Sequence, residues 1–513
     1  MSEKKALFLI DGIHKADNTV SAVRELCGRH NADPGAFLWI GGTEKMKDRE
    51  SFSGVFEKAF GFPVSFHPVN PGYADISNSI HALLENAPEI NTVIQLSGAP
   101  QINRHKSSKY AAAAVALGAE YIAGETVFRA YRVDTAAGKP SIGIYATDKR
   151  VGKTAFGSYI GSLLCGIRGK GGEYSPVIIT HSRGGPDDPP LIDIYRKSSG
   201  KPPAELTKKE LLTSRFKPEY LGRLLDFGLH GASDVFEDAL IISAYLDAWE
   251  DGGREAPYIS LIGCRRAGAA YFNEFAVSNV DKGIRAANLT PADIIVHEGS
   301  GAEHPPVEVN AVVFLVPSDA EAGLLEDFPG LEKAPLFIFA NCQHETSTPE
   351  NPDRIIKAIK TRRPDASFRY TRFEPEIIGS GPGGLSGRKA AFFTTAPGYI
   401  IDTLSRRIEN MYGCGVVAAF NNLDNDAAMR DSIKEVSGKC DIMLFEIKAR
   451  GVEGAIYAKE RYGSEYLYVN NIPVEVDRNF NPLGSNDGLD GAITETAHAA
   501  ASLFSERKAS SPV

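Results

Sequence analysis

One segment of the chain has the residue types and spacing needed to bind the phosphates of a nucleotide. It consists of Thr147, Asp148, Lys149, Arg150, Val151, Gly152, Lys153 and Thr154. An apolar run at 142–145 precedes it and an apolar, helix-like stretch at 156–164 follows it, which is the strand, loop and helix order of a P-loop. Backbone N–H groups at the helix start would cradle the phosphates, Lys153 would neutralise the β- and γ-phosphates, and Thr154 would bind Mg²⁺. We therefore expect ATP and Mg²⁺ to bind here; a chance Gly-Lys-Thr in a turn is the alternative.

A second segment could supply the carboxylate that such a metal site requires. Residues 294–298 form an apolar run that ends in Glu298, and Gly299 and Gly301 then allow a tight turn beside a ligand. Carboxylate oxygens are suitable ligands for Mg²⁺. We predict that Glu298 coordinates the metal directly or through water, with a solvent-facing Glu at a strand end as the alternative.

Basic residues that follow other expected strands indicate a second, highly anionic ligand. They are Arg183, Arg265, Arg266 and Lys448. Arginine can form paired hydrogen bonds with phosphate oxygens, and the glycines near the arginines let backbone amides approach the same oxygens. We predict that these four residues contact substrate phosphates in catalysis, with Lys149 or Arg150 beside the nucleotide. The alternatives are ordinary surface charges for the arginines and a solvated face for the segment of Lys448.

Some chemically suggestive residues have a structural explanation as well. Cys264 lies beside two arginines, which could lower its pKa, but a buried, inert thiol is the prediction we favour. His230 and Asp234 could line the site, or they could belong to a helix start capped by Ser233. The pair Asp11 and His14 follows the first expected strand and could contact a ligand or simply satisfy each other.

Two segments look like additions to the core. Residues 379–387 are rich in glycine and follow no clear strand, so we predict a flexible loop. Residues 197–217 are polar and rich in lysine, which predicts solvated helices or a flexible insertion, with a lid over the phosphate site as the alternative.

The elements that must position these residues alternate along almost the whole chain. Short apolar runs are separated by stretches with apolar residues at helical spacing, which predicts an α/β fold with parallel sheets. Ligands of such sheets bind where the strands deliver their carboxyl ends. We expect a Rossmann-like N-terminal domain at 1–138 that ends in a linker near 133–140. A P-loop nucleotide-binding domain would follow at 139–345, then a C-terminal α/β region at 346–485 and a tail at 486–513.

Composition excludes several classes of protein. The chain has 513 residues, of which 43% are hydrophobic, and its net charge is −9, which argues against a broad surface for nucleic acid or an anionic membrane. The longest apolar runs are far shorter than the roughly 20 residues that span a bilayer. The six cysteines are widely separated and form no CxxC pair. These features predict a cytoplasmic protein with reduced thiols. They leave the oligomeric state open, a homodimer included.

Taken together, the segments resemble those of the cyclic 2,3-diphosphoglycerate synthetase family. They are Asp11-Gly12, 147–154, 182–186, 232–240, 263–266, 278–280, 298–302, 394–397 and 446–449. The P-loop, which has Thr147 where glycine is usual, and the strand ending in Glu298 also resemble those of dethiobiotin synthetase and its relatives. The first resemblance implies ATP-dependent closure of 2,3-diphosphoglycerate into its cyclic pyrophosphate, with release of ADP and phosphate. The second substrate would then be a small-molecule bisphosphate.

Other functions remain open from the sequence. A dethiobiotin synthetase-like ligase acting on another anionic substrate would share the P-loop and the Glu298 segment, although the arginine-rich loops favour a bisphosphate. A P-loop ATPase that switches partner binding is a second alternative, because such proteins often carry an additional lysine like Lys149 in the loop. A storage or transport protein would leave the expected Mg²⁺ and ATP residues unexplained.

Overall fold

The N-terminal domain is a parallel sheet with helices on both faces. The computed structural model describes residues 4–67, 73–129, 138–149, 151–169, 171–182, 189, 191–193, 238–239, 241–242, 245–246, 257–267, 277–299, 305–321, 331 and 334–510. The elements of this first domain are β1 (Lys4–Ile10), α1 (Ala16–His30), β2 (Ala32–Trp39), α2 (Arg49–Phe60), β3 (Val64–Phe66), α3 (Tyr73–Asn86), β4 (Thr92–Gln95), α4 (Arg104–Ala116), β5 (Glu120–Ala123) and β6 (Thr126–Phe128).

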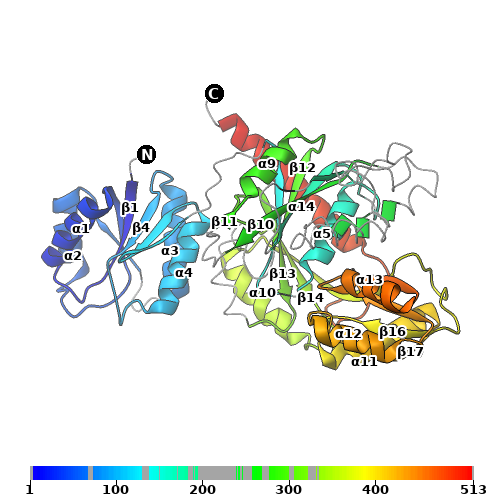
Figure 1. Ribbon diagram of the computed structural model, residues 1–513. Helices are drawn as coiled ribbons and strands as arrows, with labels where there is room; N and C mark the ends of the chain where they lie inside the picture. Colours follow the sequence, from blue (N-terminus) through cyan, green and yellow to red (C-terminus); the bar gives the residue numbers. More distant parts are fainter. Residues whose placement is uncertain are drawn as a thin grey trace.

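The strands of this domain run in the order β3-β2-β1-β4-β5-β6, and all neighbours except β5 and β6 are parallel. Helices α1 and α2 pack on one face of the sheet, and α3 and α4 pack on the other, because alternate residues of β1 point to opposite faces. The domain lies to one side of the rest of the chain (Figure 1). This arrangement is doubly wound, with helices on both faces of an α/β sheet.

The central domain is built around the strand that precedes the P-loop. Its elements are β7 (Ser141–Ala146), α5 (Lys153–Leu164), β8 (Pro176–Ser182), β9 (Leu191–Asp193), β10 (Ser260–Ala267), β11 (Val277–Ser278), α9 (Val280–Leu289), β12 (Ile294–Glu298), β13 (Ala311–Pro317), β14 (Leu336–Ala340), α10 (Glu350–Arg362) and β15 (Ser367–Ile377). Strand β7 is paired with β12 on one side and with β13 on the other, and both pairs are parallel. The loop after β7 therefore lies at the centre of the sheet's carboxyl edge.

The C-terminal region continues the same sheet. Its elements are β16 (Lys389–Phe393), α11 (Gly398–Tyr412), β17 (Gly415–Phe420), α12 (Asp426–Val436), β18 (Ile442–Glu446), α13 (Gly451–Tyr462), β19 (Tyr466–Val476) and α14 (Asp487–Ser510). The long strands β15 and β19 pair antiparallel and join the two parts of the sheet. Among the described residues this sheet contains 13 strands. Helices α11, α12 and α13 lie with β16 and β17 at the end of the molecule away from the N-terminal domain (Figure 1).

The structure differs from three expectations about the C-terminal part. Residues 487–510 of the expected tail form helix α14, which returns to the central domain and buries Leu489 and Ile493 against α5 and its neighbours. The expected flexible loop at 379–387 is bonded to the end of α11, since Gly383 N–H donates to Met411 O at 2.8 Å and Leu385 N–H donates to Tyr412 O at 3.0 Å.

The sheet also does not break at 345, because β14 pairs with β15. We therefore place the change from the central to the C-terminal domain beyond β15. The segment at 197–217 lies outside the described residues, as do His230, Asp234 and most of the expected linker.

Candidate active site

The P-loop turn depends on a glycine at the start of α5. Gly152 has a φ of +96°, which only glycine adopts readily, and it is the N-cap of the helix. A Cβ at this position would collide with the ring of Phe373, which reaches the loop from β15. The first turn of α5 has no acidic residue. Its backbone N–H groups and the positive end of the helix dipole can therefore act on an anion.

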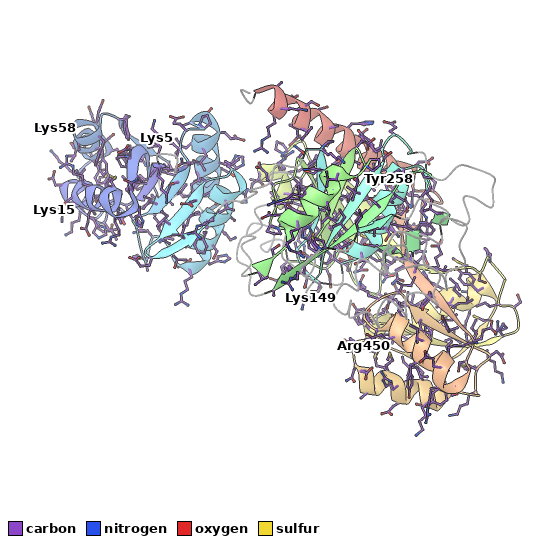
Figure 2. All side chains as sticks on the ribbon, turned by 45° about the horizontal axis from the view of Figure 1, so that its top comes forward. Lys5, Lys15, Lys58, Lys149, Tyr258 and Arg450 are labelled. Atoms are coloured by element: carbon purple, nitrogen blue, oxygen red, sulfur yellow. The ribbon has the colours of Figure 1, made fainter. Side chains whose placement is uncertain are left out.

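Lys153 is held along the same loop. Its side chain is only 7% exposed, and its amine donates to the carbonyl oxygen of Asp148 at 2.7 Å. The Thr147 side chain is also buried, and within the described part of the chain its hydroxyl has no hydrogen-bond partner. Asp148 and Lys149 are exposed at the tip, where Lys149 is labelled in Figure 2, and Arg150 lies outside the described residues. A buried amine and an unsatisfied hydroxyl on one loop suit a phosphate ligand.

Thr154 and Glu298, the two residues expected to hold Mg²⁺, meet beside this loop. The Thr154 hydroxyl donates to Glu298 Oε1 at 2.8 Å, and the Glu298 side chain is buried. Gly157 on α5 makes room for the carboxylate, because a Cβ there would lie 2.8 Å from Glu298 Oε2. A hydroxyl and a carboxylate side by side at a P-loop are suitable oxygen donors for Mg²⁺. The residues present therefore fit this metal.

A second buried carboxylate, that of Asp238, contacts α5 one helical turn after Thr154. The Ser158 hydroxyl donates to Asp238 Oδ1 at 2.5 Å and contacts the Thr154 carbonyl oxygen at 3.3 Å. Asp238 is completely buried. It supports the helix face that carries Thr154, a role that the spacing of the 230–238 segment did not indicate.

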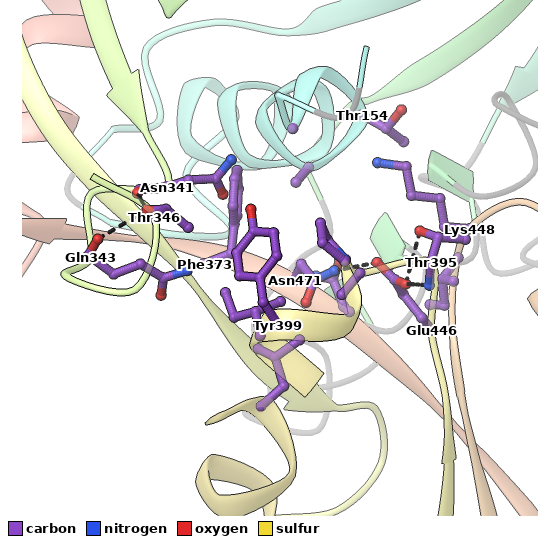
Figure 3. A pocket seen from close by; sticks show the side chains of 18 of the residues that line it. Thr154, Asn341, Gln343, Thr346, Phe373, Thr395, Tyr399, Glu446, Lys448 and Asn471 are labelled. Carbon is purple, nitrogen blue, oxygen red and sulfur yellow. Dashed lines mark hydrogen bonds between the residues drawn. The ribbon is translucent and has the colours of Figure 1, made fainter. Parts of the chain in front are cut away.

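A pocket opens from the P-loop toward the C-terminal domain (Figure 3). Its lining residues come from residue 241, from the start of α5, from the segment after β14, from β15 and β19, from α11 and from the carboxyl ends of β16 and β18. They are Gly152, Thr154, Ala155, Ile241, Asn341, Gln343, Thr346, Phe373, Thr395, Ala396, Pro397, Tyr399, Ile400, Leu404, Glu446, Ile447, Lys448, Asn470 and Asn471. The carboxyl edges of both halves of the sheet therefore contribute to one cavity.

Glu446 organises the C-terminal wall of this pocket. Its carboxylate accepts hydrogen bonds from the Thr394 hydroxyl at 2.7 Å, from Thr395 N–H at 2.7 Å and from Asn471 Nδ2 at 2.6 Å. These bonds hold the end of β18, from which Lys448 extends toward Thr154 (Figure 3). The Lys448 amine has no hydrogen bond or ion pair with any described residue. It is a positive charge available to a ligand at the P-loop.

Three family models match consecutive parts of the chain. The descriptions are cyclic 2,3-diphosphoglycerate synthetase, N-terminal domain for residues 5–129, P-loop domain for 141–371 and C-terminal domain for 383–472. A relative from Methanothermobacter thermautotrophicus with the name cyclic 2,3-diphosphoglycerate synthetase is 30% identical over 98% of this chain and 97% of its own length. The chain belongs to the cyclic 2,3-diphosphoglycerate synthetase family.

Other members of the cyclic 2,3-diphosphoglycerate synthetase family align over similar lengths. The relative from Methanothermus fervidus is 29% identical over 98% of this chain and 99% of its own length. The relative from Rubrobacter xylanophilus is 28% identical over 97% of this chain and 98% of its own length. A synthetase is an ATP-dependent ligase, so the predicted enzyme class and the predicted P-loop domain are confirmed.

The structure separates two of the basic residues that the sequence placed in one cluster. Arg265 and Arg266 are consecutive on β10, so their side chains leave opposite faces of the sheet. Arg266 is buried near His181, on the face covered by α9, whereas Arg265 is half-buried on the α5 face. Arg183 lies outside the described residues. Of the three basic residues that the structure describes, Lys448 lines the pocket, and Arg265 and Arg266 do not.

Two buried histidines accompany Arg266. Nitrogen atoms of His181 and His297 lie 3.3 Å apart, and burial lowers the pKa of both rings, that of His297 to about 3. Both histidines are therefore neutral at physiological pH. Burial raises the pKa of the Cys264 thiol, which agrees with the inert thiol favoured from the sequence.

Most of the pocket could not be predicted from the sequence. Asn341, Gln343, Phe373 and Tyr399 come from segments without a phosphate-binding pattern. The available signal was the position of Asn341 directly after the apolar run at 336–340, because ligands bind at the carboxyl ends of such strands.

Within the described residues, no helix combines the length and the apolar character needed to cross a bilayer.

Proposed function

We propose that this enzyme uses ATP to close 2,3-diphosphoglycerate into its cyclic pyrophosphate and releases ADP and phosphate. The observation that carries the proposal is the convergence of Lys153, the Thr154–Glu298 pair and Lys448 on one P-loop. We further propose that the enzyme acts in the cytoplasm. This rests on its cysteines, all of them free thiols.

The proposed reaction proceeds in two balanced phosphoryl transfers. In the first, an oxygen of one substrate phosphate attacks the γ-phosphorus of ATP, and the bond from that phosphorus to ADP breaks. In the second, the neighbouring phosphate of the same molecule attacks the phosphorus that carries the new group, and inorganic phosphate leaves with the bonding electrons. The products are ADP, phosphate and the cyclic anhydride. Both nucleophiles are phosphate oxygens that are ionised at neutral pH, so the reaction needs no general base.

The chain's own residues position these anions. Lys153 and the backbone N–H groups of the loop hold the β- and γ-phosphates, and Lys448 adds a positive charge from the C-terminal side. Mg²⁺, held by Thr154 and Glu298 when bound, would neutralise charge on the same phosphates. Arg183, Arg265 and Arg266 stay our candidates for the substrate phosphates. Fixing both phosphates of one molecule in attack geometry supplies much of the rate.

Phosphorus NMR tests the reaction directly. The enzyme with ATP, Mg²⁺ and 2,3-diphosphoglycerate should yield new pyrophosphate resonances, with ADP and phosphate in equal amounts. ATP consumption that requires bicarbonate instead would favour a dethiobiotin synthetase-like ligase. Nucleotide-dependent oligomerisation without turnover of any phosphorylated metabolite would favour a switch protein. Either of these results would overturn the proposal.

Lys448→Met should lower kcat by about 10²-fold, because it removes a charge that acts on the transferred phosphoryl group but keeps the length of the side chain. Steady-state ADP release measures the effect. Lys459→Met on α13 is the matched control, since Lys459 is exposed and does not line the pocket. Equal rates for Lys448→Met and the control would remove Lys448 from the site.

A further inference from the structure

The ring of Phe373 fills the space that Gly152 leaves open in the P-loop turn. A Cβ built on Gly152 would collide with Cζ, so it is the far end of the ring that contacts the turn. The same ring meets the ring of Phe156 edge to face, with centroids 6.0 Å apart and an angle of 74° between the planes. Phe373 therefore touches the first turn of α5 at both of its ends, and Thr154 lies between the two contacts.

This first turn is the part of the loop where a small displacement has the largest effect. Its N–H groups and the Thr154 hydroxyl are the groups expected to face the phosphates and Mg²⁺. No side-chain hydrogen bond caps the helix, and Gly152 has no side chain to pack. The turn thus depends on a ring from a distant part of the chain, and a shift of about 1 Å in a reacting group can cost on the order of 10²-fold in rate.

The backbone of Phe373 is held from the C-terminal region. Its partner on β19 is Pro473, which has no N–H group to donate. The carbonyl oxygen of Phe373 accepts a hydrogen bond from Nη1 of Arg407, on helix α11, at 3.1 Å. The strand that carries the ring is therefore fixed, at this residue, by a side chain from another element.

Arg407 is well placed to fix Phe373 because several groups fix the guanidinium itself. Its side chain is 16% exposed, and Nε lies 3.7 Å from Oε2 of the buried Glu374. Nη2 donates to Gln343 Oε1 at 3.0 Å. A planar guanidinium with partners at three of its nitrogens has little freedom to move. Figure 3 shows Phe373 on the same side of the pocket as Gln343, below α5.

We propose that Phe373 is a positioning residue for the P-loop and that Arg407 holds Phe373 in place. The proposal rests on the proposed function, since it assumes that phosphates bind at the P-loop. Ile400 and Leu404, which line the pocket, lie on the same face of α11 as Arg407, seven and three residues before it. The C-terminal region would then act on the phosphates in two ways, through the charge of Lys448 and through the packing of the Phe373 ring.

The length of the side chain at position 373 tests the contact with Gly152. Leucine and methionine have similar apolar volumes, but only methionine reaches as far as the phenyl Cζ. Phe373→Leu should lower kcat by about 10- to 100-fold, whereas Phe373→Met should retain most of it. Phe368→Leu is the matched control, because Phe368 lies on the same strand but stacks on Phe337. It should lower the unfolding temperature and leave kcat unchanged.

Substitutions of two adjacent arginines test the second contact. Arg407→Met should lower kcat in the wild-type enzyme and cost little more in Phe373→Leu, because the ring that it holds no longer reaches the turn. Where methionine impairs folding, Arg407→Lys keeps a charge near Glu374 and loses the guanidinium fork. Arg406→Met should behave like the wild-type enzyme, since Arg406 is exposed and donates to Asp402 O of its own helix at 3.2 Å.

Titration with a non-hydrolysable ATP analogue in Mg²⁺ measures the effect on the P-loop without a second substrate. Phe373→Leu should weaken the analogue by roughly tenfold, about the loss of one hydrogen bond to a charged group, and Phe373→Met should not. Equal kcat and equal affinity in these two variants, or fully additive losses for Phe373→Leu and Arg407→Met, would overturn the proposal. The titration needs no bisphosphate, so it remains decisive even where the proposed reaction fails.

Discussion

Lys153→Ala is expected to lower ATP turnover on the order of 10³-fold without unfolding the protein. The Lys153 amine lies within the loop that would hold the phosphates and donates to the carbonyl oxygen of Asp148 at 2.7 Å. On nucleotide binding it can exchange this neutral acceptor for charged phosphate oxygens, which form stronger hydrogen bonds. Alanine removes this charge at a position where charge develops during phosphoryl transfer. The measurement is the rate of ADP release at saturating ATP.

Two comparisons separate this effect from general damage to the loop. The thermal unfolding midpoint of Lys153→Ala without nucleotide should stay within a few degrees of the wild-type value, because the side chain lies in a polar loop and not in the apolar core. Lys459→Ala removes an exposed amine on α13 that does not line the pocket and should leave turnover unchanged. Equal losses in the two variants would contradict the assignment of Lys153 to the phosphates.

The sequence predicts the central site well because its determinants are local. A buried strand followed by Gly152-Lys153-Thr154 fixes the loop, and the apolar run ending in Glu298 belongs to a neighbouring parallel strand. Parallel strands deliver their carboxyl ends to one edge, so the contact between Thr154 and Glu298 follows from two short segments. The tertiary fold only had to place β12 beside β7.

The pocket could not be predicted in the same way because it depends on β15 and β19. Strand β15 has the sequence SFRYTRFEPEI, in which charged and aromatic residues alternate, and no apolar run marks it as a core strand. Its pairing with β19 brings Phe373 against Gly152 and sets the C-terminal strands opposite the P-loop. Helix α14 was missed for a related reason, since alanines make up much of its buried face.

The position of Arg266 shows a second reason why parts of the site could not be predicted from the sequence. Two adjacent basic residues suggest one anion site, but in a strand consecutive side chains point to opposite faces. The strand continues through Ala267, further than the apolar run that marks it, so Arg265 and Arg266 are still within its pleat. A correct strand boundary would have separated them, and strand ends are where apolar patterns carry the least information.

Glu298→Gln should raise the Mg²⁺ concentration needed for half-maximal turnover by about 10- to 100-fold and affect the affinity for metal-free nucleotide much less. Glutamine keeps an oxygen that can accept the hydrogen bond from the Thr154 hydroxyl, which lies 2.8 Å from Glu298 Oε1. The local packing therefore persists while the negative charge is lost. The measurements are the Mg²⁺ dependence of ADP release and, independently of activity, the thermal stabilisation that ATP produces with and without Mg²⁺.

Substitutions at Thr154 decide whether this pair acts as one metal site. Thr154→Ser keeps the hydroxyl and should retain the Mg²⁺ dependence of the wild-type enzyme, whereas Thr154→Ala removes it and should reproduce the defect of Glu298→Gln. Because both side chains would hold the same ion, the double variant should lose less than the sum of the two single free-energy changes. Fully additive losses would mean that Thr154 and Glu298 serve separate purposes, and the metal would then have to be bound elsewhere on the loop.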